Sequence, residues 1–152
     1  DLHLLSRRQR QMCIRDSTNT RLKRVYLAGP PSMEAEADRE RVVGINEEEL
    51  KTPGCISRHL KNSELPLYIS LDKDILTRSC AITNWDQGEA QLEDVLTCIK
   101  EAASCRSIIG VDVCGENTDD QEEEGNRASQ TNQNTNRKII CKLLEICDVL
   151  CP

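Results

Sequence analysis

Aromatic residues are nearly absent from this sequence: they make up 2% of its 152 residues, and phenylalanine does not occur. The hydrophobic core must therefore be built from leucine, isoleucine, valine, alanine and cysteine. Long apolar runs are also missing, and none approaches the roughly 20 residues of a membrane-spanning helix. The first residues lack the sustained apolar segment of a signal peptide. We therefore expect a cytoplasmic protein without a membrane partner, and its length predicts one domain.

Positive charge and histidine are both scarce. Acidic residues outnumber Lys and Arg by 26 to 20, which gives a net charge of −6. Nucleic-acid binding needs a basic face, so this charge argues against a nucleic-acid partner. The two histidines, His3 and His59, stand in different surroundings, and no Cys-x-x-Cys motif occurs. A zinc site is therefore not expected.

Cysteine, in contrast, is abundant. The number is odd, and most of the nine positions fall within apolar patterns: Cys13, Cys55, Cys80, Cys98, Cys105, Cys114, Cys141, Cys147 and Cys151. We interpret them as reduced, mostly buried thiols of a cytosolic protein. A nucleophilic cysteine needs a base partner, and the sequence carries no known motif of a catalytic cysteine.

The first 17 residues, DLHLLSRRQRQMCIRDS, differ in character from the rest. The string RRQRQMCIRDS resembles a translated sequencing adapter, which would make residues 1–17 a non-native extension of a truncated reading frame. A basic N-terminal arm is the alternative. We therefore base the expected fold on residues 22–152.

The most informative stretch is PLYISLDKDIL, residues 66–76. Its alternating apolar residues predict a buried strand over 66–71, followed at once by Asp72 and Asp74. On an extended backbone, side chains two residues apart point to the same side. The two carboxylates could therefore bind one Mn2+ or Mg2+ ion. The alternative is a polar turn or a helix cap, which often uses the same residues.

The surrounding pattern predicts an α/β fold. We expect strands over 24–28 and 107–113, while residues 41–45 fit either a short strand or a loop. Apolar residues at helical spacing predict a helix over 90–103. A strand, helix and strand in this order form a right-handed unit with parallel strands, which brings Asp112 to the same sheet edge as the Asp pair. Residues 115–135 are almost wholly polar and predict a long mobile loop before a final helix over 136–150.

The segment YISLDKDILTRSCAITNWDQG, residues 68–88, resembles the third signature of the ureohydrolase family, which includes arginase, agmatinase and formiminoglutamase. Ser70, Asp72 and Asp74 match the family's Ser-x-Asp-x-Asp in order, Thr83 and Gly88 fall in its loop, and a helix pattern follows. The resemblance implies a three-layer α/β/α arrangement with a mostly parallel sheet, as part of an arginase-like fold. It covers roughly residues 22–150.

The resemblance also implies a manganese-dependent hydrolase that attacks the C–N bond of a guanidino or amidino substrate with metal-activated hydroxide. Asp72 would bridge two Mn2+ ions, Asp74 would bind one of them, and Asp112 and Glu116 would contact the substrate. The family's Gly-Gly-Asp-His-Ser and Asp-Ala-His-x-Asp segments, which supply four further ligands, are absent here. The chain would thus be an inactive C-terminal portion of an enzyme, whose full length allows a homo-oligomer.

Two other functions remain open. A phosphatase of the haloacid dehalogenase type also places Asp-x-Asp after a strand, but its pattern needs Thr or Val where Leu76 stands. A non-catalytic α/β binding module could retain the scaffold without the chemistry. The upstream signatures would distinguish an enzyme from such a module.

Overall fold

The computed structural model describes residues 23–29, 42–117 and 122–150, apart from a few side chains at the margins of these ranges. The proposed non-native extension, residues 1–17, lies outside them. The chain divides into two compact units, residues 1–49 and 50–152.

The first unit contains a parallel pair of four-residue strands. β1 (Val25–Ala28) pairs with β2 (Val42–Ile45), with Val25 opposite Val42 and Ala28 opposite Ile45. The expected strand over 24–28 is confirmed, and residues 42–45 form a strand rather than a loop. Next comes α2 (Glu47–Leu50), whose start carries a capping box: Asn46 Oδ1 accepts from the Glu49 amide at 2.9 Å, and Glu49 Oε2 accepts from the Asn46 amide at 3.0 Å.

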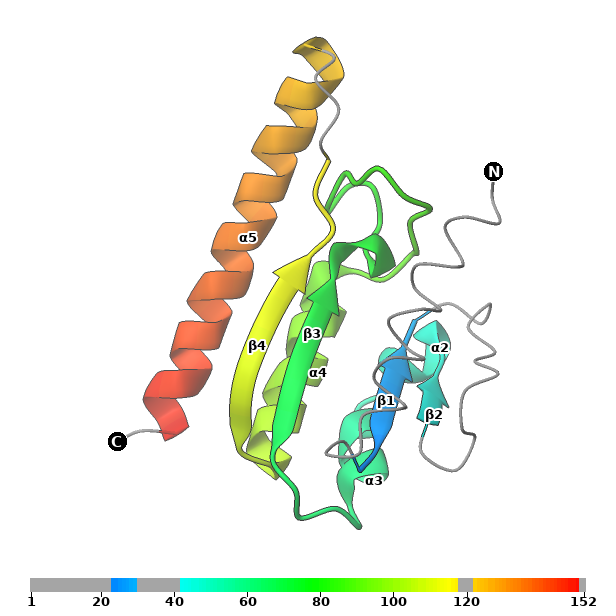
Figure 1. Ribbon diagram of the computed structural model, residues 1–152, viewed down its shortest axis with the longest axis vertical. Helices are drawn as coiled ribbons and strands as arrows, with labels where there is room; N and C mark the ends of the chain where they lie inside the picture. Colours follow the sequence, from blue (N-terminus) through cyan, green and yellow to red (C-terminus); the bar gives the residue numbers. More distant parts are fainter. Residues whose placement is uncertain (1–22, 30–41, 118–121, 151–152) are drawn as a thin grey trace. The chain divides into compact units, whose positions relative to one another are not determined.

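The second unit is built on a second parallel pair (Figure 1). Its elements follow in chain order: α3 (Cys55–Leu60), β3 (Leu67–Asp72), the 3-10 turn η1 (Lys73–Ile75), α4 (Leu92–Cys105), β4 (Ile108–Cys114) and α5 (Glu122–Leu150). β3 and β4 run parallel and α4 connects them, as the sequence predicts for residues 66–113. The boundaries of β3, α4 and β4 lie within two residues of those expected. The α/β class with parallel strands is therefore confirmed.

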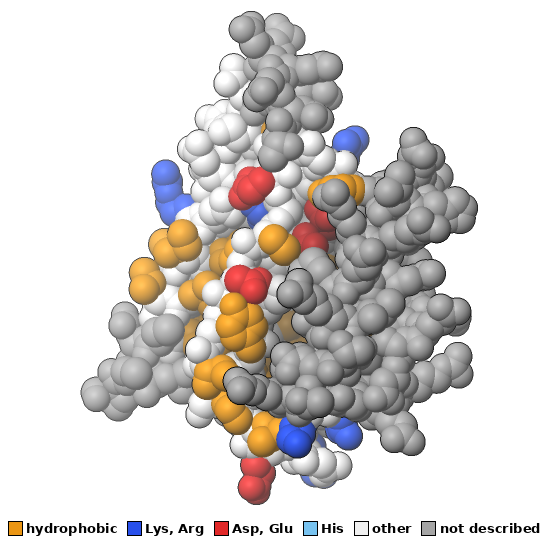
Figure 2. Space-filling view, in the orientation of Figure 1, with side chains coloured by type: hydrophobic (Ala, Val, Ile, Leu, Met, Phe, Trp, Pro, Cys, Tyr) orange, Lys and Arg blue, Asp and Glu red, His pale blue; other side chains and the backbone are white. Residues whose placement is uncertain are grey.

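The two faces of the β3–β4 pair differ in character. Leu67, Ile69 and Leu71 alternate with the more exposed Tyr68 and Ser70, so that one face of β3 enters the core. α4 lies behind this sheet in Figure 1, and its buried positions Leu92, Val95 and Ile99 share one apolar cluster with Leu71. Carboxylates and apolar side chains lie together on the opposite face, which Figure 2 shows toward the viewer.

α5 corrects the expected loop at residues 115–135, because the helix already begins at Glu122 and continues to Leu150. Its buried stripe is spaced at four and three residues: Ala128, Asn132, Thr135 and Ile139. This spacing keeps the four side chains on one helix face. Two of them are polar, so an apolar pattern does not emerge until residue 139. The sequence therefore located the second half of the helix and missed the first.

Two further expectations, about membrane-spanning helices and about the cysteines, can be compared with the structure. No helix in the described ranges has the length and apolar character needed to cross a membrane. The six described cysteines are free thiols, but only Cys55 is fully buried. The expectation of mostly buried thiols is thus wrong for this part of the chain.

Candidate metal-binding site

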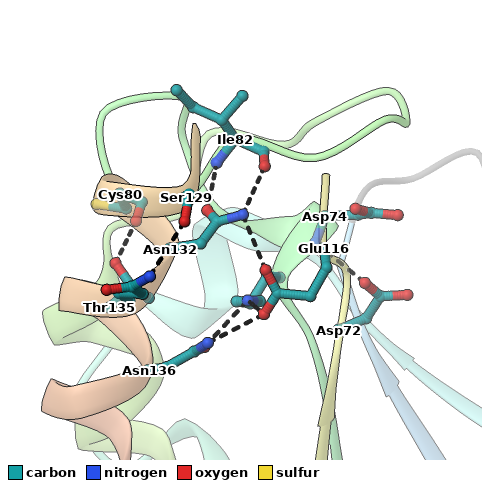
Figure 3. A network of polar contacts seen from close by, with 11 residues as sticks. Asp72, Asp74, Cys80, Ile82, Glu116, Ser129, Asn132, Thr135 and Asn136 are labelled. Atoms are coloured by element: carbon teal, nitrogen blue, oxygen red, sulfur yellow. Dashed lines mark hydrogen bonds and ion pairs between the residues drawn. The ribbon is translucent and has the colours of Figure 1, made fainter. Parts of the chain in front are cut away.

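Asp72 ends β3, and the backbone turns immediately after it. Lys73, Asp74 and Ile75 form the 3-10 turn η1, whose N-cap is Asp72: its Oδ1 accepts from the Asp74 amide at 3.1 Å. The Asp pair therefore does not continue an extended strand. The alternative of a cap is therefore confirmed for Asp72, and the carboxylates of Asp72 and Asp74 lie on the same side in Figure 3.

The two carboxylates meet over Gly115, directly after β4. A Cβ built on Gly115 would lie 2.8 Å from Asp72 Oδ1 and 3.2 Å from Asp74 Oδ1. Both oxygens therefore approach one point at the carboxyl ends of two parallel strands, where α/β proteins commonly bind ligands. Gly115 has a φ of 82°, which is in the left-handed region that glycine adopts at no steric cost. A glycine here supplies both the turn and the space beside the carboxylates.

Asp74 is the most unusual member of the pair. The residue is 9% exposed, and its Oδ1 is buried without a hydrogen-bond partner among the described residues. Desolvation and the nearby Asp72 raise the pKa of Asp74, although a hydrogen bond from Thr83 and the charge of Lys73 act in the opposite direction. A buried carboxylate oxygen without a donor is costly, because it has lost its water and gained nothing in exchange.

Asp112, the third expected acid, lies on the open face of the sheet. Its Oδ1 accepts from the Ser70 hydroxyl at 2.6 Å, and its Oδ2 accepts from the Tyr68 hydroxyl at 3.1 Å. The hydrogen bond to Asp112, followed by the charge of that carboxylate, raises the pKa of Tyr68. Ser70 and Asp112 are direct cross-strand partners. Ser70 and Tyr68 thus hold the Asp112 carboxylate on this face. Asp112 lies two residues before Cys114, the strand partner of Asp72.

Glu116 points away from the Asp pair, toward α5 (Figure 3). Its Oε1 accepts from Lys73 Nζ and from Asn136 Nδ2, the latter at 3.0 Å, while its Oε2 accepts from Asn132 Nδ2 at 3.0 Å. Burial alone would raise the pKa of Glu116, but these hydrogen bonds and the Lys73 charge outweigh it and lower the pKa. Both oxygens of this expected substrate contact are therefore occupied within the protein.

Cys114 stands beside the pair at the end of β4, opposite Asp72. Desolvation and then the charges of Asp72 and Asp112 raise its pKa to about 11. Because the thiolate is the reactive form, Cys114 is a protonated and inert thiol at neutral pH. The local field thus disfavours negative charge and favours a cation.

Three residues that sequence reasoning passed over hold this region together: Lys73, Asn132 and Thr135. Lys73 is fully buried. Asn132 donates to the carbonyl of Ile82 and accepts from its amide, at 2.8 Å each. The Thr135 hydroxyl donates to the Cys80 carbonyl. α5 therefore anchors the loop after η1. The helical spacing of residues 128, 132, 135 and 139 was the one sequence signal for this role.

The Asp pair fits part of a divalent-cation site. The orphaned Asp74 Oδ1, together with the approach of Asp72 Oδ1 and Asp74 Oδ1 to one point over Gly115, is a feature that a cation would satisfy. In the described ranges, however, no cluster of three or more His, Cys, Asp or Glu side chains has metal-binding geometry. Two carboxylates leave most of the coordination sphere of a hard cation to water or other donors.

No protein-family model matches this chain. No solved structure matches it either. A curated protein from Thermotoga maritima, described as an uncharacterized protein, is 43% identical over 51 residues, which are 34% of this chain and 20% of that relative. The chain spans about a fifth of the length of the curated relative that it matches. The similarity is thus a partial one to a longer protein.

Proposed function

We propose that Asp72 and Asp74 form part of the metal site of a manganese-dependent hydrolase that acts on the C–N bond of a guanidino or amidino compound. The observation that carries this proposal is the buried, unpartnered Asp74 Oδ1 beside Asp72. A divalent cation would give this oxygen a partner and would offset the repulsion between the two carboxylates. Mn2+ and Mg2+ prefer such oxygen ligands.

The bound metal would lower the pKa of a coordinated water, which is the chemistry that hydrolysis at a guanidinium carbon requires. The chain's own residues would bind the metal and orient the substrate. Asp72 and Asp74 supply negative charge that attracts both the metal and a cationic substrate. Asp112, whose carboxylate accepts from Ser70 and Tyr68 on the open face, would contact the polar end of a substrate.

The remaining ligands must come from outside this Asp pair, because Mn2+ takes about six donors. We propose that the complete protein supplies them. The length of the Thermotoga maritima relative, of which the matched segment is 20%, is consistent with such a protein. The 152-residue chain should then bind Mn2+ weakly and turn over no substrate.

Paramagnetic broadening of amide NMR signals by Mn2+ tests the site directly. In the 152-residue chain we expect broadening centred on residues 72–75 and 115, with a dissociation constant on the order of millimolar, as for a site with few ligands. Asp72→Asn and Asp74→Asn should abolish it. Asp86→Asn, which removes an exposed carboxylate from the loop after η1, is the matched control and should leave the broadening intact. Broadening that persists in both Asp-pair variants would contradict the proposal.

In a protein extended upstream, Asp72→Ala should abolish both tight Mn2+ binding and release of urea or an equivalent amide product, whereas Asp86→Ala should retain both. Undiminished turnover by the Asp72→Ala protein would refute the assignment. Hydrolysis of a phosphate ester in place of a guanidino compound would identify the phosphatase instead.

One observation favours a non-catalytic α/β binding module as the second candidate. Glu116, the expected substrate contact, is engaged by Lys73, Asn132 and Asn136. A module of this kind would bind Mn2+ weakly at the Asp pair, and the extended protein would neither bind it tightly nor catalyse hydrolysis.

A further inference from the structure

Lys73 stands between Asp72 and Asp74 in the sequence, yet its side chain extends into the interior, toward Glu116 and Asn136. It is fully buried, and its ammonium group donates to Glu116 Oε1 and, at 3.0 Å, to Asn136 Oδ1. A buried lysine needs such partners, because an unpaired ammonium in the interior is strongly disfavoured. The direction of the Lys73 side chain is therefore fixed by groups on other elements.

The partners of Lys73 are themselves connected. Asn132 Nδ2 donates to Glu116 Oε2 and Asn136 Nδ2 donates to Glu116 Oε1, both at 3.0 Å. We call Lys73, Glu116, Asn132 and Asn136 the Lys73 cluster; Figure 3 labels the last three. Its members come from the turn after β3, from the segment after β4 and from α5. The cluster thus joins both strand ends to one helix.

This connection has a geometric consequence for the Asp pair. η1 is a single 3-10 turn, and side chains at its successive positions point in different directions. With Lys73 held inside, Asp72 and Asp74 are left on the side of Gly115, where Asp72 Oδ1 caps the Asp74 amide. Releasing Lys73 would allow the turn to rotate and the two carboxylates to separate.

We propose that Lys73 is a positioning residue for the cation site, and that it acts through its buried ion pair with Glu116. This proposal rests on the proposed function, since it assigns Lys73 to the same metal site. The hydrogen bonds of the Lys73 ammonium go to Glu116 and Asn136, so apart from the effect of its charge on Asp74, Lys73 acts on the Asp pair through the turn. Loss of the residues that orient metal ligands typically weakens metal binding by about 10- to 100-fold.

The test substitutes Lys73→Met, which retains an unbranched apolar stem and removes the charge. Two readouts apply, both taken well below the melting temperature: hydrogen exchange of the Asp74 amide, and Mn2+ broadening at residues 72–75. The control is Ile99→Val or Ile99→Ala in the core of α4, whichever lowers the melting temperature by the same amount. A merely structural Lys73 would behave as this control does.

We expect Lys73→Met to accelerate exchange of the Asp74 amide by roughly tenfold or more, since its cap loosens locally, and to weaken Mn2+ binding by about tenfold. The Ile99 control should change neither. Exchange and broadening as in the control would overturn the proposal. If Lys73→Met does not fold, the Lys73→Met/Glu116→Gln double variant removes both charges together, and the same two readouts decide.

The two proposals fail in different ways. If the unsubstituted chain shows no Mn2+ broadening, the metal site is refuted, and exchange of the Asp74 amide alone reports on Lys73. Faster exchange in Lys73→Met would still support its control of the turn, and unchanged exchange would refute it. If the chain binds Mn2+ and Lys73→Met binds it equally well, only the positioning role is refuted.

Discussion

Gly115 is the residue on which the geometry of the Asp pair depends most directly. Its φ of 82° disfavours any side chain, and a Cβ there would lie 2.8 Å from Asp72 Oδ1 and 3.0 Å from the Lys73 amide nitrogen. Gly54 provides a comparison, because its φ is 78° but its nearest neighbour would lie 3.7 Å away, at the flexible end of Arg58. One glycine therefore combines backbone strain with a close approach, and the other has the strain alone.

We predict that Gly54→Ala destabilises the protein by about 1–2 kcal/mol, the usual cost of a left-handed non-glycine residue. Gly115→Ala should cost more, since the new methyl group also displaces Asp72, and it should abolish Mn2+ broadening at residues 72–75. Urea unfolding followed by fluorescence of Trp85, the single tryptophan, measures both free energies. Equal costs with intact Mn2+ binding would show that Gly115 does not shape the site.

At the scale of elements, α5 contributes through polar side chains as much as through its apolar stripe. Asn132 is 2% exposed, and its side-chain amide forms two hydrogen bonds of 2.8 Å with the backbone amide and carbonyl of Ile82, as a neighbouring strand would. Its third bond reaches Glu116. One side chain thus attaches the helix both to the loop after η1 and to the Lys73 cluster.

Replacing Asn132 by Ala should therefore destabilise the protein by about 1–3 kcal/mol, because two partly buried backbone groups of Ile82 lose their partner. Asn134→Ala on the exposed side of the same helix is the control. Both substitutions raise the intrinsic helix propensity by the same amount, so the difference between them isolates the tertiary hydrogen bonds. Matching unfolding free energies for the two variants would contradict this role.

The extent to which the sequence predicted these elements follows from the kind of contact involved. β3, α4 and β4 were located within two residues, because their apolar spacing is a local property of the chain. The first half of α5 was missed because Asn132 and Thr135 occupy core positions. The Lys73–Glu116 pair joins residues 43 positions apart, and Asn132 and Ile82 are 50 apart. Such pairings depend on the fold, so local spacing can place Asn132 on the buried face of α5 but cannot name its partner.

Hydrogen bonds made by charged side chains, as well as apolar contacts, join α3 to α4. Glu101 Oε1 accepts from the Ser57 amide at 2.8 Å and from the Ser57 hydroxyl, in the first turn of α3. At the other end of α3, Arg106 donates to the carbonyls of Leu60, at 2.8 Å, and Ser63. An acid at the start of a helix and a base at its end both complement the helix dipole.

These contacts predict how stability depends on pH. Burial would raise the pKa of Glu101, but hydrogen bonds from Ser57 and Ile56 and the charge of Arg58 outweigh it and lower the pKa. A folded-state pKa below the unfolded value of about 4.3 stabilises the protein at higher pH, and that contribution is lost as the pH falls through the folded pKa.

Glu101→Gln should therefore lower the free energy of unfolding at pH 7 and flatten its decline below about pH 5. Urea titrations across pH 3–7 on both proteins measure this difference. Glu93→Gln, which removes an exposed acid from the first turn of the same helix, is the control and should retain the decline. A decline of unchanged steepness in Glu101→Gln would show that Glu101 is not linked to folding.

At the scale of the whole molecule, the two units differ in what supports their strands. β1 and β2 have four residues each, and an isolated two-stranded pair is marginal in water. β3 and β4 are longer, and α4 and α5 contribute to the apolar cluster against them. Each unit has its own parallel pair, yet parallel strands are stable chiefly where helices cover them.

We therefore predict a gradient of backbone protection along the chain. Amides of β3, β4 and α4 should exchange slowly, at the free energy of global unfolding, whereas those of β1 and β2 should exchange through local opening at a much lower cost. Hydrogen-exchange mass spectrometry of peptides covering residues 23–29 and 42–50, compared with 67–72 and 92–114, measures both classes in one experiment. Added Mn2+ should slow exchange near residues 72–75 and leave the β1–β2 peptides unchanged, because the proposed site lies in the second unit. Equal protection of both strand pairs would mean that the two units unfold as one, and the first would then be as firmly supported as the second.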